Sequence, residues 1–129
     1  MRLSFRHLWL AISLTVLQIA APALLSAQST PTATFKAYYD AAKKKDFAAM
    51  KRLMSARDLN EIAKAPIAPE RMMELLVERV PPVMPETRNE RITGDRASLE
   101  VLRAETKEWE TTFFVHENGM WKISASETK

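Results

Sequence analysis

The sequence has no cysteine, only two glycines and only two histidines among 129 residues. The absence of cysteine excludes disulfide bonds, thiolate catalysis and thiolate metal ligands. Gly94 and Gly119 both fall in predicted turns, which leaves no glycine for a phosphate-binding loop. His116 is the last histidine and has no second histidine nearby with which to bind zinc. We therefore expect no metal and no cofactor, and a fold that is held together by packing alone.

Acidic residues are missing from the N-terminal stretch, where none precedes Asp40, whereas Arg2 and Arg6 lie within the first seven residues. The formal net charge of the whole chain is +3, from 19 basic and 16 acidic residues. Without Arg2 and Arg6 the balance is 17 to 16, a net charge of +1. A nearly neutral body lacks the positive field that nucleic-acid binding requires, so we expect no nucleic-acid partner.

Residues 1–27 have the layout of a secretory signal peptide, with a basic start, an apolar centre at Leu8–Leu17 and small residues at the end. Cleavage is expected after Ala27, which places the mature protein in the periplasm or outside the cell. An uncleaved membrane anchor is the alternative. It is the weaker one, because Gln18 and Pro22 interrupt an apolar run that is barely long enough to span a bilayer.

Residues 28–129 form one predicted domain whose first half is helical. Apolar residues recur at helical spacing in the first segment, and Thr32 or Thr34 is the expected cap of that helix. Asp46 is expected to cap the second helix, and Pro69 to stand in the first turn of the last one. Helices are predicted over residues 34–45, 46–55, 57–64 and 69–80. Methionines at this spacing are expected to fill the core: Met50, Met54, Met72, Met73 and Met84.

Beyond Pro81 and Pro82 the apolar pattern becomes alternating, which is typical of strands. Four strands are predicted, over residues 88–93, 96–105, 108–116 and 120–127. Gly94 and Asp95 form the first turn and place Ile92 beside Ala97. The chain therefore predicts an α+β fold, with N-terminal helices packed on a curved four-stranded antiparallel meander.

The last turn sets the register of the closing hairpin. A three-residue loop, Glu117–Gly119, places Val115 beside Trp121 and Phe113 beside Ile123, which gives one apolar face. A two-residue Asn-Gly loop would pair those side chains with Lys122 and Ser124. Burying a large apolar side chain contributes about 1.5–3 kcal/mol, so burial favours the longer loop. His116 then points away from the core.

Two stretches, GDRASLEV and FFVHENGMWKIS, resemble the nuclear transport factor 2-like (cystatin-like cone) superfamily, in particular its small exported bacterial domains of unknown function. The resemblance covers roughly residues 32–127. It implies a cone-like sheet wrapped around helices, often with a cavity at the open end and with dimerisation through the sheet. The superfamily includes isomerases that use an acid with a tyrosine, and that motif does not map onto this sequence residue by residue.

Polar residues collect toward one end of the predicted inner face. A candidate ligand pocket there comprises Tyr39, Arg88, Glu90, Arg103 and Trp109. Arginine suits an anionic ligand and tryptophan an aromatic one. A partly solvated ladder of cross-strand charges is the structural alternative, and it is the favoured one.

The leading functional hypothesis is an exported, non-enzymatic domain that binds a small ligand or contacts an envelope protein. No catalytic residue is assigned, because the sequence offers no nucleophile with a base. The alternative is a cofactor-free isomerase or hydrolase that uses an acid and a tyrosine in the cavity. A third hypothesis is a homodimer formed through the sheet, with Phe114 on the outer face in the interface.

Overall fold

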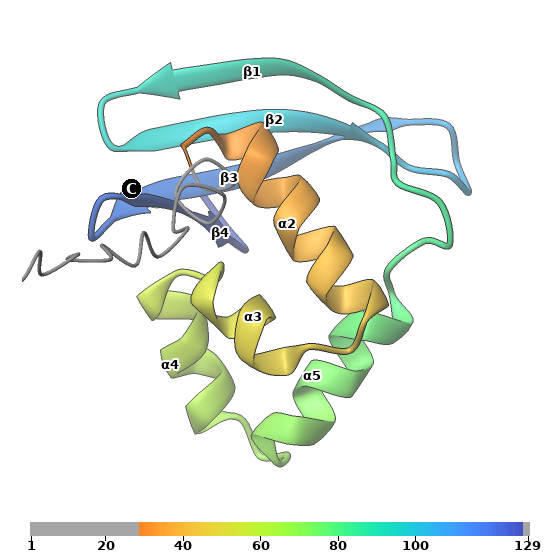
Figure 1. Ribbon diagram of the computed structural model, residues 1–129, viewed down its shortest axis with the longest axis vertical. Coiled ribbons are helices and arrows are strands. Elements are labelled where there is room, and N and C mark those ends of the chain that lie inside the picture. Colours follow the sequence, from red (N-terminus) through yellow and green to blue (C-terminus); the bar gives the residue numbers. More distant parts are fainter. Residues whose placement is uncertain (1–28, 128–129) are drawn as a thin grey trace, which may run out of the picture.

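The computed structural model describes residues 29–127, and the predicted signal peptide lies outside that range. Four helices precede four strands in the described residues, and the strands form one open antiparallel sheet in the order β1-β2-β3-β4. The helices lie on one side of this sheet, and α2 (Pro31–Lys43) passes closest to it (Figure 1). The predicted α+β architecture, with N-terminal helices on a four-stranded meander, is confirmed.

Helix α2 begins earlier than predicted. Its N-cap is Thr30, whose side chain accepts a hydrogen bond from the Ala33 amide, and Pro31 occupies the first turn. The expectation of a cap at Thr32 or Thr34 is therefore wrong. A threonine followed by proline is itself a strong start signal, because proline has no amide hydrogen to leave unsatisfied.

The remaining three helices form a group that packs against α2 and lies below it in Figure 1. Asp46 caps α3 (Phe47–Arg52) as expected, through a 3.0 Å hydrogen bond from the Ala49 amide. Ser55 caps α4 (Ala56–Lys64), and α5 (Pro69–Glu78) starts at proline as the sequence predicts.

The strands are β1 (Thr87–Thr93), β2 (Arg96–Leu102), β3 (Trp109–Glu117) and β4 (Met120–Ser124). The turn at Gly94 and Asp95 places Ile92 opposite Ala97, as expected.

The register of the β3–β4 hairpin differs from the prediction by one residue. His116 pairs with Trp121, Val115 with Lys122 and Phe113 with Ser124. The loop is the two-residue Asn118-Gly119, and both residues have the positive φ, 52° and 76°, that a type I′ turn requires. Burial could not decide the register, because β3 is apolar on both faces. The turn decides it.

The corrected register moves Phe114 into the core. Phe114 is only 2% exposed and lies opposite Ile123, whereas Phe113 and Val115 lie on the outer face, which the helices do not cover. The expectation of Phe114 on the outer face is wrong for this reason. A homodimer through the sheet stays a prediction, and Phe113 replaces Phe114 as the residue that it would involve.

A β-bulge interrupts β1 between Arg88 and Arg91, and Asn89 within it has a φ of 54°. The extra residue reverses the alternation of side chains along the strand. Glu90 consequently shares a face with Ile92 and the helices, whereas Arg88 pairs with Glu100 on the outer face.

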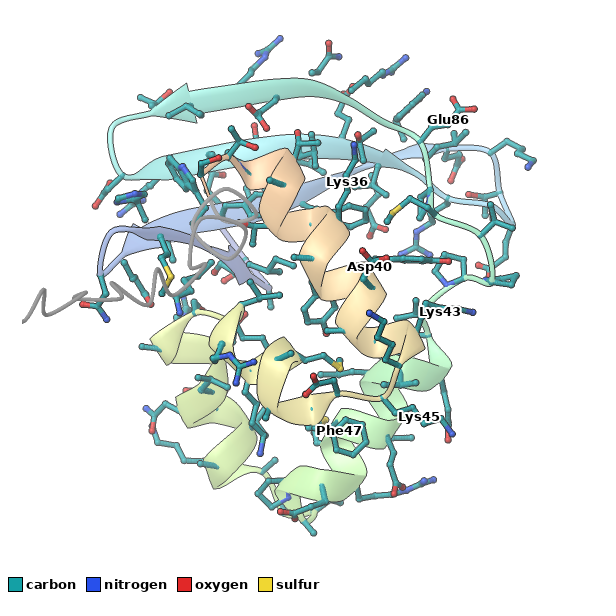
Figure 2. All side chains as sticks on the ribbon, viewed as in Figure 1. Lys36, Asp40, Lys43, Lys45, Phe47 and Glu86 are labelled. Atoms are coloured by element: carbon teal, nitrogen blue, oxygen red, sulfur yellow. The ribbon has the colours of Figure 1, made fainter. Side chains whose placement is uncertain are left out.

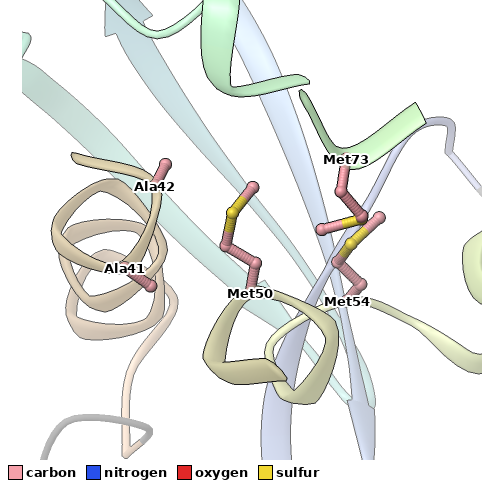
Figure 3. Packing of buried hydrophobic residues seen from close by; sticks show 5 residues of the cluster. All are labelled: Ala41, Ala42, Met50, Met54 and Met73. Atoms are coloured by element: carbon pink, nitrogen blue, oxygen red, sulfur yellow. The ribbon is translucent and has the colours of Figure 1, made fainter. Parts of the chain in front are cut away.

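The core consists of two neighbouring clusters. One lies between α2 and the sheet and contains Leu99, Phe114 and Trp121, with Phe35 packed against them. The other joins the helices through Met50, Met54 and Met73, of which Met50 and Met73 are wholly buried. Figure 3 shows Met50 lying between Ala42 of α2 and the other two thioethers. Methionine as core filler is thus confirmed for these three positions.

The edge of β4 is covered by the segment that joins α3 to α4. The Ser55 amide donates to the carbonyl of Ile123, and the Ile123 amide donates to the carbonyl of Leu53, at 2.8 and 2.7 Å. This short parallel pairing fixes the helices to the sheet. Among the described residues, no backbone segment pairs in this way with the other edge strand, β1.

Candidate functional site

A pocket of about 770 Å³ opens between α2, the connection from α5 to β1, and the end of the sheet where β2 passes into β3. Figure 1 shows these segments meeting on the right of the molecule. Small-molecule sites in proteins usually measure about 300–1,000 Å³, so the volume suits a small ligand.

Aromatic side chains of α2 form the first wall. Phe35, Tyr38 and Tyr39 recur at helical spacing and line the pocket from the same side of the helix. Tyr39 is buried, and its hydroxyl donates a 2.9 Å hydrogen bond to the carbonyl of Pro81. That bond fixes the second wall of the pocket to the first.

The second wall is the end of α5 and the proline-rich connection that follows it. Its apolar lining residues are Leu76, Val80, Pro81, Pro82 and Pro85. Proline has a fixed φ and no amide hydrogen, so this wall is stiff and presents few polar donors. The walls are therefore formed before any ligand arrives, which lowers the entropy cost of binding.

The sheet supplies the third wall and part of the rim. Val101 and Thr112 line the pocket from the sheet, and Arg103 and Glu110 lie at the rim. The Arg103 guanidinium donates two hydrogen bonds to the Glu110 carboxylate, at 2.6 and 2.8 Å. These bonds lower the pKa of Glu110 below its usual range, so the pair stays charged.

Tyr38 lines the pocket and has a raised pKa. Burial raises the pKa of its hydroxyl to about 12, and the carboxylate of Asp58 adds to the effect. A phenol with this pKa is neutral at physiological pH. It can donate a hydrogen bond and is a poor general base.

Two of the five predicted pocket residues, Tyr39 and Arg103, line this pocket. Glu90 lies elsewhere on the helix-facing side of β1, where its carboxylate accepts hydrogen bonds from the amide and the hydroxyl of Thr32. It stabilises the N-terminus of α2, since an anion is favoured at that end of the helix dipole.

Arg88 and Trp109 lie on the outer face of the sheet, and the expectation that Arg88 faces inward is wrong. The Arg88 guanidinium lies 3.9 Å from the centroid of the Trp109 ring and 2.7 Å from a Glu100 carboxylate oxygen. The bulge is the cause, because it turns Arg88 to the side away from the helices. These contacts form a cation–π and ion-pair group that is separate from the pocket.

Asp40 and His116 do not line the pocket either. Asp40 is exposed on the side of α2 that also carries Lys36 and Lys43 (Figure 2). His116 is on the helix-facing side of β3, contrary to the prediction. It is nevertheless exposed at the end of the hairpin, where its ring and that of Trp121 form a T-shaped pair with centroids 4.9 Å apart.

Sequence reasoning missed Phe35, Arg79 and the proline-rich wall. A signal is present for Phe35, which belongs to the apolar stripe of α2. The prolines by themselves indicate only the end of a helix, and the sequence has no comparable signal for Arg79. The return of the chain from α5 past α2 is a tertiary feature that the sequence pattern does not contain.

In the part of the chain from 29 to 127, no helix has both the length and the apolar character to cross a bilayer. Those residues also contain no cluster of three or more His, Cys, Asp or Glu side chains arranged to hold a metal ion. No protein-family model, curated protein or solved structure matches this chain.

Proposed function

We propose that this chain is an exported domain of the nuclear transport factor 2-like type that binds a small ligand without catalysing a reaction. The observation that carries the binding role is the pocket, which has a suitable volume, apolar walls from three elements and charged side chains only at its rim. The export and the family stay proposals that rest on the sequence patterns of residues 1–27 and 32–127.

The distribution of polar groups supports binding rather than catalysis. The inner walls are aliphatic, aromatic or proline apart from Thr112 of the sheet, and the Tyr39 hydroxyl already donates its hydrogen bond to the Pro81 carbonyl. The isomerase or hydrolase alternative needs an acid beside a tyrosine. Asp40 is the acid next to Tyr39 in the sequence, and it is exposed and outside the lining. The acids that do line the pocket are exposed, and two of them are ion-paired: Glu78, Glu105 and Glu110.

Binding of the neutral dye Nile red tests the proposal. Its fluorescence should rise when it enters the pocket, because the dye emits strongly in apolar surroundings. Ala104→Trp should reduce this signal, since Ala104 is an exposed lining residue and the indole would fill the mouth. The matched control is Ala63→Trp, at an exposed position of α4 outside the lining.

A saturable signal that falls for Ala104→Trp and persists for Ala63→Trp supports the proposed site. The absence of any fluorescence increase, or equal binding by both variants, contradicts it. The export part has a separate test, the intact mass of the protein recovered from its own cells. A mass that includes residues 1–27 would reject cleavage after Ala27.

A further inference from the structure

The charged side chains at the rim of the pocket differ in whether they have an ion-pair partner. Arg103 and Glu110 bind each other through two hydrogen bonds. Glu105 lies in the same loop and adds to the field on Arg103. Glu78 has a carboxylate oxygen 3.7 Å from a guanidinium nitrogen of Arg71. Arg103, Glu110 and Glu78 therefore each have an ion-pair partner, whereas Glu105 acts on Arg103 only at longer range and forms no ion pair among residues 29–127.

Arg79 is the one cation at the rim that has no ion-pair partner among the described residues. It is the C-cap residue of α5, it lines the pocket, and its side chain is exposed. Among residues 29–127 no carboxylate forms an ion pair with its guanidinium. The helix dipole favours a cation at the C-terminal end of a helix. Stabilisation of α5 is therefore the alternative explanation for an arginine at this position.

We propose that the ligand is an amphipathic monocarboxylate, an inference that rests on the proposed function. Its apolar body lies between Phe35 and the proline-rich wall, and its carboxylate binds the Arg79 guanidinium at the mouth. A guanidinium presents two parallel N–H donors that match the two oxygens of a carboxylate. Apolar walls with one unpaired cation at the rim are complementary to a molecule of this kind.

The acids at the rim restrict the charge that the ligand can carry. Glu78, Glu105 and Glu110 line the same pocket, so a second negative charge would meet repulsion that one guanidinium does not offset. A monoanion is therefore favoured over a phosphate dianion. A cationic amphiphile would meet Arg79 itself with a like charge.

Isothermal titration calorimetry with three probes of equal chain length tests this inference. The probes are dodecanoate, dodecan-1-ol and dodecylammonium, each used below its aggregation limit. We expect dodecanoate to bind about three- to tenfold more tightly than the alcohol, a modest factor because Arg79 is exposed to solvent. Dodecylammonium should bind most weakly, and raising the salt concentration should reduce the preference for the carboxylate.

Arg79→Gln should remove the difference between dodecanoate and the alcohol while leaving alcohol binding unchanged. The matched control is Arg57→Gln, an exposed arginine of α4 outside the pocket lining, which should keep the full preference. Arg79→Lys should retain part of the preference, because the charge remains and the planar pair of donors does not. A purely structural role of Arg79 would lower the melting temperature and leave the order of the three probes intact.

The outcomes separate the two proposals. If none of the three probes binds, the proposed function fails. If the alcohol and dodecanoate bind equally, or Arg79→Gln keeps the preference, the pocket stands and the carboxylate inference is overturned. Equal losses in Arg79→Gln and Arg57→Gln would also overturn it, since general electrostatic attraction would then explain the preference.

Discussion

The adjacent phenylalanines of β3 provide a direct test of the hairpin register. Phe114 is 2% exposed and belongs to the cluster between the sheet and α2, whereas Phe113 lies on the outer face of the sheet. Truncation of a buried phenylalanine to alanine usually costs about 3–5 kcal/mol, because transfer energy is lost and a cavity remains. On the outer face only cross-strand packing is lost, about 1 kcal/mol or less.

Urea unfolding of Phe114→Ala and Phe113→Ala should therefore differ strongly in midpoint, with unchanged m-values. For a domain of this size about 3 kcal/mol corresponds to a drop in melting temperature of at least ~12 °C. Phe114→Leu is the control for the cavity and should lose much less, since most of the apolar volume is kept. An equal or larger loss for Phe113→Ala would refute the two-residue turn and restore the longer loop.

Three other features give predictions of their own. Gly119→Ala should lower the unfolding free energy by about 1–2 kcal/mol, because an L-residue is strained at a φ of 76°; a neutral effect in urea would contradict the type I′ turn. The folded-state pKa of Glu110 is lowered by Arg103, so the stability that this carboxylate contributes is present above its ordinary pKa of 4.5 and is lost as the pH falls through the lowered value. Melting curves of the wild type and Glu110→Gln should accordingly converge in acid, and parallel curves would argue against the pair. Tyr38 has a raised pKa of about 12, so the stability that its neutral form contributes declines as the pH rises above 10. Tyr38→Phe should remove the step in tyrosinate absorbance near pH 12. A step that survives the substitution would show that the raised pKa belongs to another tyrosine.

The helices could be predicted because their signals are local. The apolar stripe of α2, the cap at Asp46 and the proline at residue 69 each act within a turn or two of chain. The start of α2 is harder to predict, because three threonines, Thr30, Thr32 and Thr34, all qualify as caps. The proline directly after Thr30 distinguishes the correct one.

The hairpin register could not be obtained from burial. Phe113 and Phe114 point to opposite faces, so either register buries one aromatic ring on β3. The preference of Asn118-Gly119 for a two-residue turn is the decisive local signal. The prediction of a longer loop gave more weight to the number of apolar side chains that would share one face of the hairpin.

The site depended on features of longer range. Helical spacing and strand alternation predict that Tyr39 and Arg103 share one end of the molecule, and both line the pocket. The face of Arg88 could not be predicted, because a single bulged residue reverses the faces of the residues that precede it in β1. Arg79 and the proline-rich wall reach the pocket only through the path of the chain after α5.

The thioether cluster of the helical group has a consequence for how the protein ages. Peroxide can attack Met50 and Met73 only when the domain opens, since neither sulfur-bearing side chain is exposed to solvent in the folded state. Sulfoxide would then place a polar oxygen among apolar neighbours and hinder reclosing. The rate of oxidation at these two positions therefore measures how often the domain opens. Each methionine that is oxidised also makes it harder for that molecule to fold again.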